Sequence, residues 1–141
     1  MLRRGALITT LLLLLSPPAT ADIAIITHPD NPVANLNQKE VQKIFLGRLR
    51  MYPESELETQ AVDLPAEDPL FLRFYDTIAR MNAAKIKRYR AYYLFSGKGR
   101  LPLVEPDEKH VMTRVASDPS AIGYVDASLV TDQVRVVFVL K

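Results

Sequence analysis

A short apolar segment that runs through a proline-containing loop into a helix constrains this chain more than any other feature. Residues 61–64 are apolar apart from Asp63, and Asp68-Pro69 then places an N-cap acid before a proline at the first helical position. Strand-to-helix loops of α/β folds carry ligands, because the free amides at the start of the helix attract small anions. The segment therefore predicts an α/β fold with a candidate binding site in this loop.

The loop also carries its own acids, which leaves its role open. In the binding interpretation, the amides of residues 66–70 and the side chain of Arg73 hold a small anion. The alternative is an ordinary helix N-terminus whose dipole is met by the loop's own acids, each contact contributing about 0.3–1 kcal/mol. A cation or amine held by the carboxylates is a third option, although no calcium-loop pattern is present. The candidate ligand-binding residues are Asp63, Ala66, Glu67, Asp68, Leu70 and Arg73.

The N-terminal residues are typical of a secretory signal peptide. Arg3 and Arg4 precede an apolar run over residues 6–15, and Ala19-Thr20-Ala21 supplies small residues for cleavage. The apolar run is too short to span a bilayer, which takes about 20 residues. The absence of cysteine removes both disulfides and a lipid-attachment thiol. We expect residues 1–21 to be the signal peptide and residues 22–141 to form one periplasmic domain, without membrane insertion after cleavage.

Charge excludes one class of partner and predicts a dipolar surface. The chain has 18 Lys and Arg against 16 Asp and Glu, and Arg3 and Arg4 of the signal peptide account for the whole excess. A balanced domain gives no reason to expect nucleic acid as a partner. The charges are segregated along the chain, with an acidic group before a basic one. The acids are Glu54, Glu56, Glu58, Asp63, Glu67 and Asp68, and the cations are Lys85, Lys87, Arg88, Arg90, Lys98 and Arg100.

Hydrophobic periodicity predicts strands that alternate with helices, which gives an α/β fold with a mixed sheet of four or five strands flanked by helices. We expect strands over residues 23–27, 61–64, 122–125 and 134–140, with the last one buried on both faces. Helices are expected over residues 38–46, from Pro69, from Asn82 to Gly97, and after Asp107. Residues 101–104 are expected to be a connector, and Gly123 to mark a bulge or the close approach of another backbone.

Three segments resemble a known family in order and spacing: residues 40–48, 95–99 and 121–125. They are similar to the phosphate-type solute-binding proteins of ABC transporters, and more closely to short exported proteins named phosphate ABC transporter substrate-binding protein-like. The resemblance covers residues 23–141 and implies a single lobe of the type II periplasmic-binding-protein fold. It also implies phosphate or another small oxyanion as ligand, and a membrane transporter or sensor as partner.

The chain departs from that family at the ligand loop. Full-length phosphate binders carry an arginine and a Ser-Gly-Thr-type loop at the strand-to-helix position, whereas residues 63–68 contain no serine, threonine, arginine or glycine. Short relatives often keep a serine before the proline and an arginine shortly after it, where this chain has Asp68 and Phe71. Two hypotheses therefore stand: an exported solute-binding-like protein, or an accessory interaction module that has lost its ligand.

Two further segments are candidates for binding. A secondary basic loop consists of Ser96, Gly97, Lys98, Gly99 and Arg100, and its alternative interpretation is a glycine C-cap with cations at the negative end of a helix. Residues 85–95 interleave four cations with aromatic residues. Within them, Tyr89 and Tyr93 are expected in the core, and the cations on a solvated face or a partner-docking surface.

No residue pattern indicates catalysis or a cofactor. The two histidines, His28 and His110, have no partner at metal-ligand spacing, and the chain has no cysteine. Neither a nucleophile elbow nor a Ser-x-x-Lys motif is present. We therefore expect a protein that is not an enzyme and that needs no metal or cofactor; the oligomeric state is not indicated.

Overall fold

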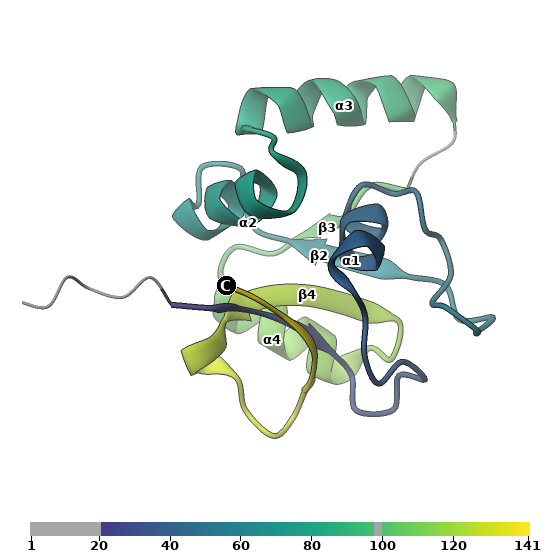
Figure 1. The fold of residues 1–141 in the computed structure, drawn as a ribbon, viewed down its shortest axis with the longest axis vertical. Helices are drawn as coiled ribbons and strands as arrows, with labels where there is room; N and C mark the ends of the chain where they lie inside the picture. Colours follow the sequence, from purple (N-terminus) through teal and green to yellow (C-terminus); the bar gives the residue numbers. More distant parts are fainter. Residues whose placement is uncertain (1–20, 98–99) are drawn as a thin grey trace, which may run out of the picture.

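The computed structural model describes residues 21–97 and 100–141, which form a five-stranded mixed sheet with helices on both faces (Figure 1). The predicted signal peptide lies outside the described residues, apart from Ala21. The strand order is β3-β2-β4-β1-β5. The strands are β1 (Ile23–Thr27), β2 (Gln60–Asp63), β3 (Leu103–Val104), β4 (Ala121–Asp126) and β5 (Arg135–Leu140). The predicted α/β class is therefore confirmed.

The sheet combines parallel and antiparallel pairs. Strand β2 runs parallel to both β3 and β4, whereas β1 runs antiparallel to β4 and β5. The carboxyl ends of β2, β3 and β4 therefore meet at one edge of the sheet, where α/β folds place their ligands.

Helices begin and end where the caps predict. The helices are α1 (Gln38–Phe45), α2 (Pro69–Ala79), α3 (Ala83–Ser96) and α4 (Glu108–Ser117), followed after β4 by a short 3-10 helix, η1 (Ala127–Leu129). Asn37 and Glu40 form the expected capping box on α1. Asp68, Asn82 and Asp107 cap the three later helices through their side chains.

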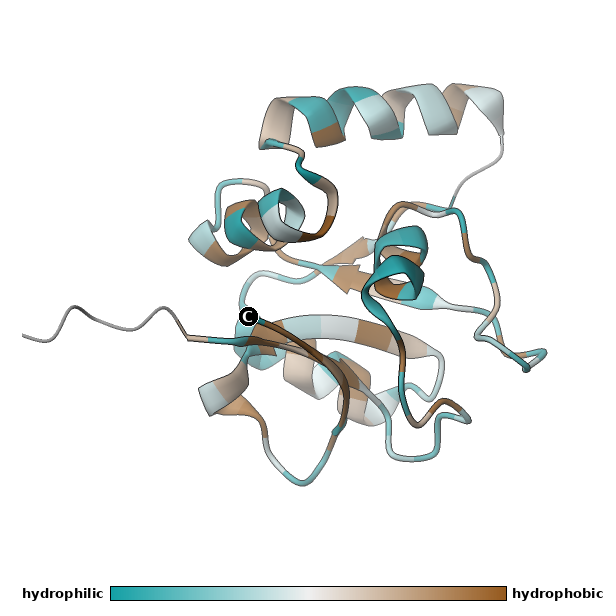
Figure 2. Cartoon of the chain, viewed as in Figure 1, coloured by the Kyte–Doolittle hydropathy of each residue, from teal (hydrophilic) through white to brown (hydrophobic). Residues whose placement is uncertain are grey.

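The core consists of two layers, one on each face of the sheet. Helix α4 covers one face, while α1 and α2 cover the other, and α3 lies outermost beside α2 (Figure 1). In Figure 2 the hydrophobic residues gather in the strands, whereas α3 is coloured mainly in polar and intermediate shades. Ile86 is the one buried residue of α3 among those described, so this helix contributes little to the core.

Three sequence predictions need correction. Strand β5 is an edge strand, and Val136 and Val139 are 37% and 40% exposed. The prediction that this strand is buried on both faces was therefore wrong. Part of the expected connector, Leu103–Val104, pairs with β2 as β3. Tyr89 and Tyr93 are half-buried rather than core residues, because α3 lies at the surface.

Gly123 does mark a close approach, but the neighbour is a helix side chain rather than a backbone. A Cβ atom at residue 123 would lie 2.6 Å from Cγ1 of Val111 and 3.3 Å from Cγ2 of Val115, both on α4. Helix α4 therefore packs closely on β4 because residue 123 has no side chain.

Gly123→Ala tests this contact. We expect the substitution to lower the free energy of unfolding by about 1–3 kcal/mol, because Val111 must shift. Urea unfolding of the single variant and of Gly123→Ala in a Val111→Ala background measures it. The cost of Gly123→Ala should be smaller in the Val111→Ala background; an equal cost in both would show that Val111 is not the constraint.

Candidate functional site

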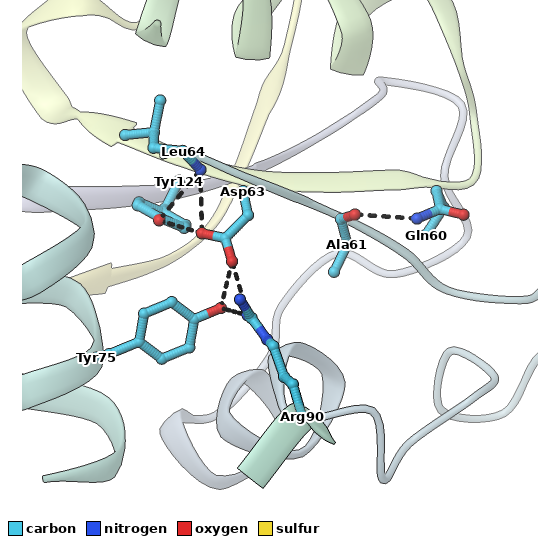
Figure 3. A network of polar contacts seen from close by, with 7 residues as sticks. All are labelled: Gln60, Ala61, Asp63, Leu64, Tyr75, Arg90 and Tyr124. Atoms are coloured by element: carbon cyan, nitrogen blue, oxygen red, sulfur yellow. Dashed lines mark hydrogen bonds and ion pairs between the residues drawn. The ribbon is translucent and has the colours of Figure 1, made fainter. Parts of the chain in front are cut away.

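The carboxylate of Asp63, at the carboxyl end of β2, is fully enclosed by hydrogen-bond donors (Figure 3). Its Oδ2 accepts hydrogen bonds from the Tyr75 hydroxyl at 2.8 Å and from Nη2 of Arg90 at 2.7 Å. Its Oδ1 accepts from the Tyr124 hydroxyl and from the Leu64 backbone N–H. We call Asp63, Tyr75, Arg90 and Tyr124 the strand-end cluster.

Four elements bring this cluster together. Strand β2 supplies Asp63, β4 supplies Tyr124, α2 supplies Tyr75 and α3 supplies Arg90. The ring of Phe74 stacks on Tyr124 with centroids 3.9 Å apart, which fixes that hydroxyl against β2. Because three of the four groups come from segments distant from β2 in sequence, the cluster depends on the whole fold.

Arg90 makes an additional contact with the aromatic rings of α2. Its guanidinium lies 5.2 Å from the ring centroid of Tyr75 and 5.9 Å from that of Phe71. The side chain of Arg90 is 21% exposed, whereas that of Asp63 is fully buried. The guanidinium thus bridges the buried carboxylate and the surface, and it ties α3 to the rest of the molecule.

The electrostatics of the cluster keep both tyrosines as donors. Burial, together with the neighbouring Asp63 carboxylate, raises the pKa of Tyr75 and of Tyr124 well above the ordinary value of 10.0. An isolated buried carboxylate is costly, and here the Arg90 charge and the surrounding donors compensate it. The strand-end cluster is therefore an anion-binding arrangement whose anion is a side chain of the same chain.

The predicted loop residues differ in their surroundings. Asp68 caps α2, because its Oδ1 accepts the Leu70 N–H at 2.8 Å, while Leu70 itself is buried. Ala66 and Glu67 are exposed beside the cluster. The expectation that Asp63 would meet the helix amides is corrected, because its carboxylate faces the tyrosines and Arg90 instead.

The side chain of Arg73 extends toward the N-terminal segment of the described chain. Its Nη2 donates to the Ala21 carbonyl oxygen at 2.7 Å, next to the start of β1. In this structure Arg73 therefore contacts the N-terminal segment and not the amides of residues 66–70, with which the sequence grouped it.

The secondary basic loop has the features of a helix C-terminus where it is described. Gly97 ends α3 in the left-handed conformation with φ of 67°, and the Ser96 hydroxyl donates to the Tyr93 carbonyl oxygen. Arg100 pairs with Glu58 at 2.6 Å. Lys98 and Gly99 lie outside the described residues.

The described ranges, residues 21–97 and 100–141, contain no group of three His, Asp or Glu side chains arranged to hold a metal ion. No helix in the same ranges is both long and apolar enough to cross a membrane.

Comparison with known proteins identifies the fold. No family model and no curated protein matches the chain. Among solved structures, one described as a phosphate ABC transporter substrate-binding protein with bound phosphate, from Clostridium perfringens, has a TM-score of 0.67 at 21% identity, over 83% of this chain and 45% of that one. An ABC-type phosphate transport receptor from Vibrio cholerae gives 0.66 at 17% identity, over 83% and 46%.

A third solved structure, PstS from Borrelia burgdorferi, has a TM-score of 0.64 at 13% identity, over 86% of this chain and 47% of that one. The chain thus spans about half the length of the solved structures that it matches. The resemblance to phosphate ABC transporter substrate-binding proteins is confirmed for the fold, which corresponds to a single lobe of that architecture.

Sequence reasoning missed three members of the strand-end cluster. Tyr75 and Tyr124 were placed in a helix and a strand without a polar role, and Arg90 was counted among surface cations. One signal was available: Asp63 is an acid inside an otherwise apolar strand, and a buried acid needs a cation and hydrogen-bond donors. The identity of those partners depends on how α3 packs, which no local pattern indicates.

Asp63→Asn tests the charge balance of the cluster. The variant keeps the shape of the side chain but leaves the Arg90 charge unpaired, so we expect the free energy of unfolding to fall by about 2–4 kcal/mol. Asp76→Asn, the same change at an exposed position of α2, should change it by no more than about 0.5 kcal/mol. Urea unfolding measures both, and equal effects would contradict a role for the ion pair.

Alkaline pH tests the tyrosines. The unfolded chain loses the phenol protons near pH 10, whereas the folded protein retains those of Tyr75 and Tyr124 because their pKa values are raised. Stability is therefore fully present below pH 10 and falls above it, by about 1.4 kcal/mol per pH unit for each retained proton. Unfolding of the wild type and of Tyr124→Phe between pH 8 and about 11.5 should give a shallower fall in the variant; parallel curves would contradict this.

Proposed function

We propose that this chain is an exported, periplasmic solute-binding-like protein: a single lobe that recognises a small anion and reports to a membrane partner, either an ABC transporter or a membrane sensor. The N-terminal sequence supports export, and the fold supports solute recognition, because a protein of the same fold is described with bound phosphate. No catalytic role is included in this proposal.

The observation that carries the proposal is the strand-end cluster itself. Two hydroxyls, a backbone amide and a guanidinium converge on a carboxylate at the carboxyl end of β2. This is the position where α/β folds bind solutes, and the donors are those that oxyanion sites use. The Asp63 carboxylate already occupies the centre of these donors. We therefore expect a solute on the solvent-facing side of the strand-end cluster.

The outer side of the cluster offers positive charge. Nη2 of Arg90 contacts Asp63 and Tyr75, and among the described residues Nε and Nη1 have no hydrogen-bond partner. Lys87 lies one helical turn away on the same face of α3. Phosphate or another small oxyanion that meets these two side chains would also lie beside the exposed turn at Ala66 and Glu67.

Calorimetric titration with phosphate, sulfate and acetate, at low and at physiological salt, tests the proposal. We expect saturable heat from at least one of these anions, and weaker binding at the higher salt, because the site is partly exposed. Lys87→Gln should weaken that binding, whereas Lys85→Gln, on the outer face of α3, should not. Absence of heat and of thermal stabilisation with every small anion would contradict the proposal.

A second candidate function is an accessory interaction module in an envelope or signalling complex, and the surface of α3 supports it. Tyr92, Leu94 and Phe95 are 72%, 61% and 93% exposed, and Tyr92 and Phe95 continue the face of α3 that carries Lys85 and Arg88. Aromatic residues and arginine are enriched in protein interfaces. A helix with such a surface is suited to contact an acidic partner.

Charge reversal tests this second function. Lys85→Glu combined with Arg88→Glu should remove specific partners from a pull-down with membrane extracts, because the docking surface would repel an acidic partner. Lys39→Glu combined with Lys43→Glu, on α1, serves as the control with the same change in net charge. An unchanged set of partners for the α3 variant would count against the interaction module.

A further inference from the structure

A hollow of about 370 Å³ lies between α2 and α3, beside the strand-end cluster. Its accessible apolar surface comes from Ala83 and Ala84 on α3 and from Leu101 before β3, while the buried side chains of Phe71 and Ile86 lie beneath it. The volume lies within the usual range for small-molecule sites, about 300–1,000 Å³. The structure thus contains a hollow open to solvent next to the strand-end cluster, which the Asp63 carboxylate fills.

The sequence creates this hollow through small side chains. Ala66 in the loop, together with Ala83 and Ala84 in the first turn of α3, lines it where larger residues would fill it. Residues 83, 86, 87 and 90 lie on one face of α3, because they are three, four and seven positions apart. The same face therefore presents both the apolar wall and the two cations, Lys87 and Arg90, that line the hollow.

Charge and polarity together define the solute. The apolar part of the lining favours a solute that has an apolar part of its own, since a fully hydrated ion would lose water against it without gaining donors there. The two cations favour a negative group at the rim, although Arg90 is already paired with Asp63. Glu67, which follows Ala66, and Asp68 would repel a doubly charged phosphate more strongly than a singly charged group.

We propose that this hollow binds an organic monocarboxylate, with its apolar part against Ala83, Ala84 and Leu101 and its carboxylate beside Lys87 and Arg90. The inference rests on the proposed function, and it names the class of solute. The Arg90 guanidinium would then contact two carboxylates: that of Asp63 in the interior and that of the solute at the surface.

Two probes of matched size test the charge requirement. Hexanoate and its neutral amide, hexanamide, are titrated into the protein while its amide resonances are followed by NMR. We expect hexanoate to bind with a dissociation constant below about 1 mM and to shift the resonances of residues 66, 84 and 87. Hexanamide should bind about three- to fivefold more weakly, as for the loss of one exposed ion pair.

Matched variants test the location. Ala84→Leu fills the hollow and should weaken hexanoate binding at least tenfold, whereas Ala91→Leu places the same side chain on the exposed part of α3, outside the hollow, and should leave binding unchanged. Lys87→Gln should remove the preference for hexanoate over hexanamide, while Lys85→Gln should keep it. Circular dichroism and thermal unfolding confirm that each variant folds.

The possible outcomes separate this inference from the proposed function. Equal binding of hexanoate and hexanamide, or an unchanged affinity in Ala84→Leu, would overturn the inference. Binding of phosphate with shifts at residues 64–70 and no effect of hexanoate would also overturn it, but would leave the proposed function standing. If no anion shifts any resonance, both fail.

Discussion

The ion pair between Asp63 and Arg90 is the interaction on which the arrangement of this molecule depends. It places a carboxylate at the carboxyl end of β2, where it is fully buried, and it anchors the outermost helix to the sheet. Without Arg90 the carboxylate would be buried and uncompensated, and without Asp63 helix α3 would be held by the buried Ile86 and by the Tyr89 hydroxyl, which donates to the Leu46 carbonyl oxygen. The ion pair thus links the interior of the lobe to its most exposed helix.

The same pair fills the carboxyl end of β2 from within the chain. In this chain an internal carboxylate and two tyrosines close the inner part of that position. The donors of Tyr75, Tyr124 and Arg90 are thereby satisfied within the chain.

Local signals in the sequence predicted most of the fold. Asn37 with Glu40, Asp68 with Pro69, and Gly97 each fixed a helix end, because capping depends on neighbouring residues alone. The exposure of β5 and the pairing of Leu103–Val104 were missed, because both depend on the order of strands in the sheet. Apolar composition does not distinguish a central strand from an edge strand.

The candidate site was predicted only in part, for a similar reason. The loop after β2 and its acids were identified correctly, and Asp68 caps α2 as expected. Arg73 was grouped with the loop because it is near in sequence, but its side chain extends toward Ala21. Arg90, which contacts Asp63, is 27 residues away in the chain, and only the packing of α3 on α2 brings it there.

A crystal structure of the protein at saturating phosphate tests the central claim most directly. With Asp63 as the permanent anion of the strand-end cluster, we expect the carboxylate to remain bonded to Tyr75, Tyr124 and Arg90, with any phosphate bound outside the cluster. A phosphate ion between Arg90 and the tyrosines, with the Asp63 side chain displaced, would contradict it.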